Sequence, residues 1–296
     1  MAGGNHCGAV AQRLKDYWEL TKPEVNFLVV VSALVGFYLA WHGPMDFKLL
    51  LSTLFGTLLV ASGTGTLNQY MERKSDANMR RTARRPLPAG RIHAAEAFIF
   101  GILLAIGGGL LLWFEVNPLS SVLALATLGS YLLIYTPLKK KTPFCTLIGA
   151  FPGAMPPLIG WAAARGTLNK ESMVLYTILF LWQFPHFWAI AWMYREDYSR
   201  AGLRMLPSED AEGYLTSRHI LIYLGALLLV SAVPPLMGQV GMIYLFGAVA
   251  LGIYFLLHAA RLARSRTNVL ARRLVLASVI YLPLIFGLMM LDKAPM

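Results

Sequence analysis

Three polar side chains recur at helical spacing near the end of an apolar stretch: Asn68, Glu72 and Asp76. On a helix, residues four apart lie on one face, with neighbours about 6 Å apart along the axis. An amide oxygen and two carboxylates suit Mg²⁺, which takes one or two carboxylates together with substrate phosphate oxygens. The stripe therefore predicts a site where Mg²⁺ neutralises the charge of a diphosphate. The alternative interpretation is a solvated helix end whose carboxylates form surface ion pairs.

A segment rich in arginine follows the acidic stripe. Its basic residues are Arg80, Arg81, Arg84, Arg85 and Arg91. Guanidinium groups fork onto phosphate oxygens, so carboxylates that hold Mg²⁺ beside arginines are typical of a diphosphate site. Proline and glycine at positions 86, 88 and 90 predict that the helix stops and the chain turns back. A loop that only sets membrane orientation needs no acidic stripe beside it, which favours the site.

A second acidic helix end is Glu196-Asp197, which follows the aromatic segment 180–194 and precedes Arg200. Two such ends that face each other could hold one diphosphate through metal ions. The lysines at 139–141 form a third basic element. They either only set orientation in the membrane or attract an anionic substrate.

His186 lies inside the aromatic segment, before this second acidic end. An ionisable side chain at membrane depth is costly and usually faces a cavity or a partner. His186 could ligate a metal centre, orient a substrate or bond to a backbone carbonyl, and the sequence leaves these roles open. The rings around it could stabilise a carbocation through cation–π contacts, although ordinary packing accounts for most of them.

The elements that must position these residues are membrane spans. The 296 residues are 57% hydrophobic and only 14% charged, with a mean hydropathy of +0.57, whereas soluble domains are about 25% charged. This composition excludes almost any soluble enzyme and predicts an all-α, polytopic membrane protein. We expect a cytoplasmic tail over residues 1–24 and a single transmembrane domain over 25–296. The nine expected spans are 25–41, 47–66, 97–114, 119–136, 143–163, 172–194, 219–237, 240–260 and 274–291.

The basic residues predict the orientation of the chain. Of the 26 Lys and Arg residues, all except Lys48, Arg165, Lys170 and Lys293 fall in the tail and in alternate loops on one side. Cytoplasmic loops carry the positive excess, so we expect the N-terminus in the cytoplasm and the C-terminus outside. The first 24 residues contain acidic groups and no apolar signal segment, which favours a bacterial inner membrane over a cleaved leader or a mitochondrial presequence. The net charge of +11 does not predict nucleic-acid binding, because no basic region carries a recognition module.

Four further segments carry distinctive patterns: 76–87 (DANMRRTARRPL), 135–140 (YTPLKK), 185–188 (PHFW) and 197–207 (DYSRAGLRMLP). Together with Asn68-x3-Glu72-x3-Asp76, they resemble the intramembrane aromatic prenyltransferase superfamily and, within it, the haem-modifying branch of protohaem IX farnesyltransferases. The resemblance runs from about Leu20 to the ninth span. Two departures from the superfamily pattern are Glu72 in place of Asp and the adjacent Glu196-Asp197 in place of Asp-x3-Asp. The second departure favours haem over quinone acceptors.

The resemblance implies nine helices around a central cavity open to the cytoplasmic side. It implies transfer of a farnesyl group from farnesyl diphosphate to a vinyl group of haem b, with addition of water, to give haem O and diphosphate. Mg²⁺ is the implied cofactor, and the lipid bilayer, haem A synthase and oxidase assembly factors are candidate partners. The implied metal ligands are Asn68, Glu72, Asp76, Glu196 and Asp197, of which all but Glu196 are also implied to be catalytic. The implied diphosphate ligands are Arg73, Arg80, Arg84, Arg85, Lys139, Lys140 and Arg200, and the implied haem contacts are His186, Tyr135, Trp188 and Tyr194.

Three other functions stay open on the sequence. A prenyltransferase for a quinone precursor or another aromatic acceptor would share the fold and the metal site. A secondary transporter would also have many spans and buried polar groups, but it would not need acidic and arginine clusters paired on one side. A structural membrane subunit, such as an oxidase assembly factor, would tolerate the loss of Asp76.

Overall fold

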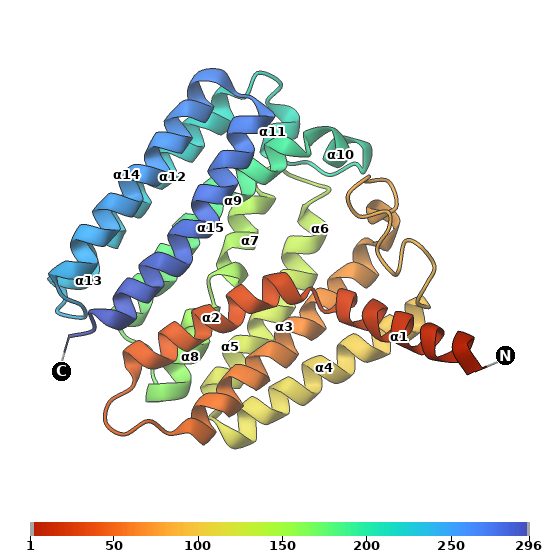
Figure 1. Ribbon diagram of the computed structural model, residues 1–296, viewed down its shortest axis with the longest axis horizontal. Helices are drawn as coiled ribbons and strands as arrows, with labels where there is room; N and C mark the ends of the chain where they lie inside the picture. The colour runs from red at the N-terminus through yellow and green to blue at the C-terminus, as the bar shows by residue number, and fades with distance from the viewer. Residues whose placement is uncertain (1–2, 295–296) are drawn as a thin grey trace.

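The computed structural model describes residues 3–294, and nearly all of them lie in helices (Figure 1). The outermost residues of the predicted tail and of the C-terminal segment, 1–2 and 295–296, lie outside the described residues. In the described part, extended pairing is limited to one isolated bridge between Val240 and Lys293. The predicted all-α class is confirmed.

The helices follow one another with short connections, apart from the long segment between α3 and α4. In chain order they are α1 (Gly3–Leu20), α2 (Pro23–Ala40), α3 (Phe47–Asp76), α4 (Ala94–Glu115), α5 (Pro118–Gly129), the π-helix η1 (Ser130–Tyr135), α6 (Thr136–Leu138), α7 (Cys145–Gly153), α8 (Pro156–Arg165), α9 (Lys170–Met193), α10 (Arg195–Arg200), α11 (Leu206–Glu209), α12 (Tyr214–Ser231), α13 (Val233–Leu236), α14 (Met242–Ser265) and α15 (Asn268–Leu291).

Within residues 3–294, nine helical segments are long and apolar enough to cross a membrane, and each overlaps one predicted span. Six of them are single helices. The other three are interrupted and consist of α5–η1–α6, α7–α8 and α12–α13. The number and places of the spans are therefore as the hydropathy predicts, while the interruptions mark where the backbone departs from a regular helix.

Proline explains the break in the fifth span. Pro152 lies in the last turn of α7, and Pro156 and Pro157 begin α8. Proline has no N–H and its ring clashes with the preceding turn, so it ends a helix but fits well at the first turn of the next one. The fifth span is therefore broken between α7 and α8.

Close packing of α8 against α2 depends on two glycines. A Cβ at Gly160 would collide with the carbonyl oxygen of Ala33, and one at Gly36 would collide with the carbonyl oxygen of Pro157. The backbones of α2 and α8 therefore touch directly, as small residues permit between membrane helices. This contact holds the second half of α2, the helix that follows Lys22, against α8.

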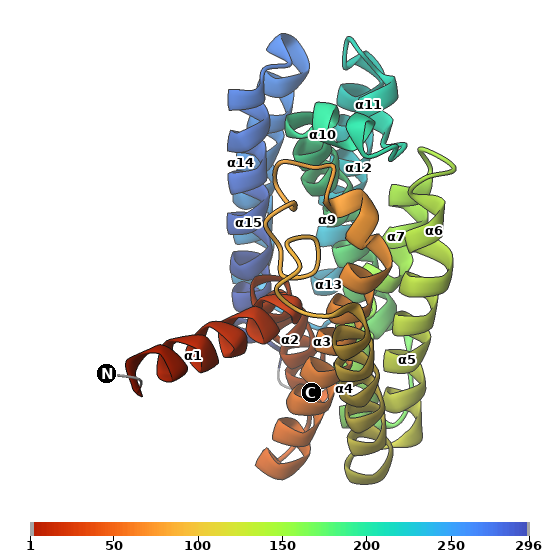
Figure 2. The same cartoon turned by 90° about the vertical axis from the view of Figure 1, so that its right-hand side faces the viewer.

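The N-terminal segment is helical, which its polar composition alone did not indicate. Helix α1 projects away from the bundle (Figure 2). Its last turns carry exposed apolar side chains, including Leu14 and Trp18. Arg91 ties α1 to the α3–α4 connection through an ion pair of 2.9 Å with Asp16. The predicted tail thus contains a helix that is tied to the α3–α4 connection.

The polar elements gather at one end of the bundle. The segment between α3 and α4, the α6–α7 connection, and α10 and α11 lie at this end in both views (Figures 1 and 2). Contacts that join them include two: the backbone N–H of Arg204 donates to the carbonyl of Lys139 at 2.7 Å, and Met79 packs with Ala201 and Leu203. All three charged segments singled out by the sequence therefore meet in space.

Candidate active site

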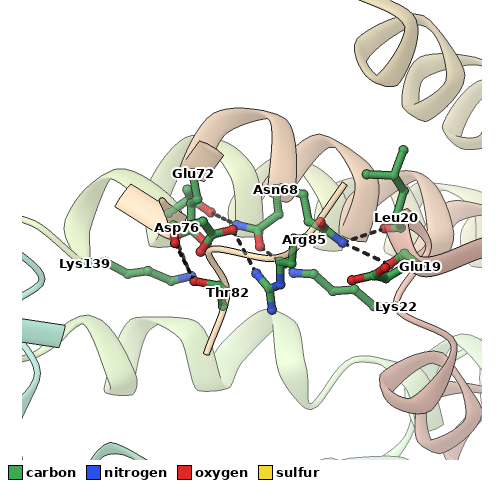
Figure 3. A network of polar contacts seen from close by, with 11 residues as sticks. Glu19, Leu20, Lys22, Asn68, Glu72, Asp76, Thr82, Arg85 and Lys139 are labelled. Carbon is green, nitrogen blue, oxygen red and sulfur yellow. Dashed lines mark hydrogen bonds and ion pairs between the residues drawn. The ribbon is translucent and has the colours of Figure 1, made fainter. Parts of the chain in front are cut away.

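Asn68, Glu72 and Asp76 lie on one face of the last turns of α3 (Figure 3). The helix continues ten residues beyond the predicted end of the span, so the whole stripe is helical. Asn68 and Asp76 are each only 1% exposed. This burial excludes the interpretation of the stripe as a solvated helix end with surface ion pairs.

Each of the two carboxylates of the stripe is bound by a basic side chain from elsewhere in the chain. Arg85 Nη1 donates to Asp76 Oδ2 at 2.9 Å, and Lys139 Nζ donates to Glu72 Oε1 at 2.8 Å (Figure 3). A buried carboxylate retains its charge only when such partners replace water. The predicted juxtaposition of acidic and basic groups is therefore present, with the basic groups directly on the acidic ones.

Lys22 completes this set, and the sequence reasoning missed it. Its Nζ donates to Asn68 Oδ1 at 2.6 Å, while Asn68 Nδ2 donates to Thr136 Oγ1 at 3.1 Å. Lys22 adopts a left-handed backbone conformation, with φ of 55°, at the start of α2. Burial lowers the pKa of Lys22 to about 7, and the positive charge of Arg85 acts in the same direction. The sequence feature that could have identified Lys22 is its position directly before Pro23, at the start of an apolar span.

Arg85 reaches the stripe because the chain folds back after α3. The hydroxyl of Thr82 donates to the carbonyl of Asp76 at 2.9 Å, and the N–H of Arg85 donates to the carbonyl of Thr82 at 3.0 Å. The N–H of Arg91 then donates to the carbonyl of Pro86, which closes the turn. The predicted return of the chain is confirmed, but α3 ends at Asp76, before the proline and glycine residues that were expected to stop it. The return orients Arg85 inward.

The other predicted arginines lie elsewhere. Arg80 and Arg84 are exposed, and their side chains make no polar contact within the described residues. Arg73 folds back on its own helix, where it donates to the carbonyl of Tyr70 at 2.6 Å and lies 4.5 Å from the centre of that ring. Among the predicted arginines of this region, the structure brings only Arg85 to the acidic stripe.

The two candidate lysines also differ. Lys139 is 7% exposed and lies 4.5 Å from the centre of the Tyr135 ring, whereas Lys140 is exposed. Burial acts to lower the pKa of Lys139, but the neighbouring groups, Tyr135 and Glu72 foremost, raise it well above its ordinary value. Lys139 follows the π-helix η1, a distortion that often occurs at functional sites. Lys139 reaches Glu72 on α3, whereas the ring of Tyr135 lies against Gly149 of α7.

The two acidic residues of the second helix end also differ in exposure. Asp197 is 8% exposed and is paired with Arg200, while the adjacent Glu196 is exposed. Tyr198 packs against the cluster of Met79 and Ala201, which joins α10 to the segment after α3. The structure thus buries Asp197 at this end of the bundle and leaves both its partner Arg200 and the adjacent Glu196 exposed.

The donor set fits Mg²⁺ that arrives with a diphosphate. In the part of the chain that the structure describes, no three His, Cys, Asp or Glu side chains come close enough to hold an ion alone. Mg²⁺ needs fewer, because it is usually bound through one or two carboxylates plus substrate phosphates. Asn68, Glu72 and Asp76 present only oxygen donors, which are hard ligands, from one helix face. The three basic partners could then bind the diphosphate.

The four predicted haem contacts do not converge. His186 faces α15, where its Nδ1 lies 2.7 Å from Ser278 Oγ. Trp188 faces α12 and packs against Tyr223. Tyr135 contacts Lys139, and Tyr194 lies under the guanidinium of Arg81.

Trp188 lines a cavity of about 460 Å³ between α7, α9, α11 and α12. The remaining lining residues include Phe144, Leu147, His219 and Tyr223. None of the acidic stripe lines this cavity, so it is not the predicted central one. The stripe itself is almost inaccessible because its own basic partners cover it. A substrate must therefore displace those partners to reach the carboxylates.

The sequence is similar to one family over most of its length. Residues 29–282 match the UbiA prenyltransferase family. The chain is 51% identical to protoheme IX farnesyltransferase of Solibacter usitatus, over 95% of this chain and 99% of that protein. It is 46% identical to protoheme IX farnesyltransferase of Koribacter versatilis, over 96% and 95%.

Solved structures with the same fold are more distant in sequence. A digeranylgeranylglyceryl phosphate synthase superposes with a TM-score of 0.78 at 19% identity, over 95% of this chain and 98% of that one. A UbiA homologue from Archaeoglobus fulgidus, bound to GPP and Mg²⁺, superposes with a TM-score of 0.63 at 14% identity, over 93% and 99%. These likenesses establish the arrangement of the helices.

Proposed function

The chain belongs to the UbiA prenyltransferase family, and we propose that it transfers the farnesyl group of farnesyl diphosphate to a vinyl group of haem b. Water adds in the same reaction, and the products are haem O and diphosphate. The acceptor is supported by relatives of 51% and 46% identity that carry the name protoheme IX farnesyltransferase and match over nearly their full length. The observation that carries the chemistry is the buried set of Asn68, Glu72 and Asp76, in which each side chain is bound by its own cation.

The metal ligands in this proposal are Asn68, Glu72 and Asp76 of α3, with Asp197 of α10. Bound there, Mg²⁺ would supply charge neutralisation for the diphosphate leaving group. Glu196 is exposed and takes no part in this set. The longer side chain of Glu72 fits the arrangement, because its carboxylate reaches Lys139 across to the next span.

The diphosphate ligands are Lys22, Arg85, Lys139 and Arg200. In the structure these groups compensate the carboxylates and the amide that would hold the metal. When the metal and the diphosphate enter together, the carboxylates gain the metal and the basic groups gain phosphate oxygens. The exchange keeps a positive partner on each buried carboxylate, which a low-dielectric site requires.

The bond that breaks is the C–O bond between C1 of the farnesyl group and the diphosphate. Lys139 and Arg85 hold negative charge as it develops on the departing oxygen, in a site prepared before the reaction. The haem vinyl carbon then attacks C1, and water adds to the cation left at the neighbouring carbon, giving the hydroxyl and releasing one proton. Tyr131 and Tyr135, at 5.8 and 4.5 Å from Lys139, wall this region with aromatic rings and limit early access of water.

Two further features belong to the same proposal. The protein is a multi-pass membrane protein. The excess of Lys and Arg on one side supports an N-terminus on the cytoplasmic side of a bacterial inner membrane. Haem A synthase and oxidase assembly factors are candidate partners, because haem O serves haem-copper oxidase assembly. The acidic site would then open toward the cytoplasm, where farnesyl diphosphate is soluble.

The proposal is tested with membranes from a host that lacks its own haem O synthase. Haem b, farnesyl diphosphate and Mg²⁺ are added with and without a chelator, and the porphyrins are analysed by liquid chromatography–mass spectrometry. We expect a new species with the mass of haem b plus farnesyl and water, which the chelator suppresses. Unchanged haem b in correctly inserted protein would overturn the haem assignment. Prenylation of an added quinone precursor under the same conditions would favour the alternative acceptor.

A further inference from the structure

His186 is held by a residue from a different helix. Its Nδ1 lies 2.7 Å from the hydroxyl oxygen of Ser278, which is fully buried in α15. His219 and His258 differ, because each contacts through Nδ1 the carbonyl four residues earlier on its own helix. A contact of that kind gives the imidazole a hydrogen-bond partner on its own helix. His186 instead depends on a partner 92 residues away.

The two contacts of Ser278 determine which nitrogen of His186 carries the proton. Ser278 Oγ also lies 2.6 Å from the carbonyl oxygen of Val275. Two oxygens at that distance need a hydrogen between them, and only the serine hydroxyl can supply it. That hydroxyl has one hydrogen, so it accepts from His186. The proton is therefore on Nδ1, and Nε2 of the neutral ring carries a free lone pair.

The plane of the imidazole is fixed as well. Trp182 stacks on His186 with ring centres 4.7 Å apart and planes 18° apart. The indole Nε1 of Trp182 donates to the backbone carbonyl of Ser278 at 2.8 Å. Ser278 therefore holds both rings, one through its hydroxyl and one through its carbonyl. Within the described chain, Nε2 of His186 has no hydrogen-bond partner.

We propose that Ser278 is a positioning residue that holds His186 in the Nδ1–H form so that Nε2 binds the iron of the haem acceptor. A histidine that ligates a metal through one nitrogen almost always donates its other N–H to an oxygen, which sets the tautomer and the ring orientation. Ser278 supplies that oxygen and Trp182 supplies the ring contact. This inference rests on the proposed function, because it assigns the iron-binding position for the same acceptor.

The test uses purified full-length protein and ferric haem b, without farnesyl diphosphate. Haem affinity is measured by absorbance titration, and the iron–nitrogen bond is followed by resonance Raman spectroscopy of the ferrous complex. We expect H186A to lose the iron–histidine band. We expect S278A to weaken haem binding about tenfold to a hundredfold, as for other residues that orient metal ligands, and to shift that band. S278T keeps the hydroxyl and should retain the band.

Controls separate an orienting role from a general loss of structure. Ser231 is also a buried serine in this half of the bundle, and its hydroxyl contacts Tyr281 at 2.9 Å. S231A should leave haem affinity and the iron–histidine band unchanged. Binding of farnesyl diphosphate with Mg²⁺ should be the same in S278A as in the wild type, because His186 and Ser278 lie outside the acidic stripe.

The outcomes distinguish this inference from the proposed function. If the wild type makes haem O but H186A or S278A leaves the band and the affinity unchanged, the inference is wrong and the function stands. If the wild type neither binds nor converts haem b, both are wrong. Equal losses of haem and farnesyl diphosphate binding in S278A would also overturn the inference, because they would show a structural role.

Discussion

Arg85 covers Asp76. The guanidinium Nη1 donates to the carboxylate at 2.9 Å across a turn of nine residues. The Asp76 side chain is 1% exposed, whereas the Arg85 side chain is 22% exposed. An anion that approaches the site from this side therefore meets the arginine before it meets the carboxylate. The pair places the diphosphate ligand outside and the metal ligand inside.

Adjacent arginines provide a matched test of this arrangement. R85A should lower kcat/KM for farnesyl diphosphate by about tenfold to a hundredfold, because hydrogen bonds to charged groups contribute about 1.5–3 kcal/mol. R84A should stay within about twofold of the wild type, since the Arg84 side chain is exposed and makes no polar contact in the described residues. Steady-state kinetics in detergent or nanodiscs measure both. Equal losses in the two variants would contradict the inward role of Arg85.

The carboxylate itself is tested by D76N. We expect turnover to fall by on the order of a hundredfold or more, a loss typical of removing one preorganised electrostatic group. The amide keeps the shape of the side chain, so the protein should still fold. D210N is a suitable control, because Asp210 accepts from the N–H of Thr216 at 2.7 Å on α12 and an amide can do the same. Wild-type turnover in D76N would rule out Asp76 as a metal ligand.

The spans and the acidic stripe could be predicted because both depend on local periodicity. Length and apolar content identify a span without knowledge of its neighbours. The spacing of Asn68, Glu72 and Asp76 fixes one helix face without knowledge of what covers it. The prolines at 152, 156 and 157 likewise end and restart a helix through their own covalent geometry.

The partners across the bundle could not be predicted, because they depend on how distant segments pack. Arg84 and Arg85 are neighbours in the sequence, and only the turn after α3 decides which of them points inward. Lys22 meets Asn68 across 46 residues, and Ser278 meets His186 across 92.

The separation of His186 from Trp188, by contrast, could have been predicted, because helical geometry alone puts the two side chains on different faces of α9. Two residues along a helix turn the side chain by about 200°. His186 accordingly faces α15, while Trp188 packs against Tyr223 on α12.

Removal of the metal should stop turnover without unfolding the protein. The carboxylates of Glu72 and Asp76 already have basic partners in the absence of an ion. A chelator should therefore abolish haem O formation, while the thermal unfolding midpoint changes by no more than about 2 °C, close to the shift that 1 kcal/mol produces in a protein of this size. Added Mg²⁺ should restore activity. A large drop in the midpoint on chelation would show a structural metal instead.

The close contact of α2 and α8 is tested by a pair of glycine substitutions. G160A should sharply lower the yield of folded protein, because the added Cβ would collide with the carbonyl oxygen of Ala33 and force the two helices apart. G287A should be neutral or slightly stabilising, since open space surrounds Gly287 in α15 and alanine favours a helix by up to about 1 kcal/mol. Fluorescence-detected size-exclusion chromatography and thermal melts compare them. Equal yields would contradict the direct backbone contact.

Lys22 is the residue whose role depends most on the folded arrangement. Its Nζ donates to Asn68 Oδ1 at 2.6 Å, so it borders the position proposed for the metal and the diphosphate. K22M keeps the length of the side chain and removes the charge, and we expect farnesyl diphosphate to bind about tenfold more weakly. K15M is the control, because Lys15 is exposed on α1. The selective result, weaker diphosphate binding in K22M with unchanged haem affinity, requires that Lys22 contacts the diphosphate and not the acceptor. If K22M binds farnesyl diphosphate like the wild type, Lys22 only donates a hydrogen bond to Asn68. The proposed diphosphate ligands would then be Arg85, Lys139 and Arg200.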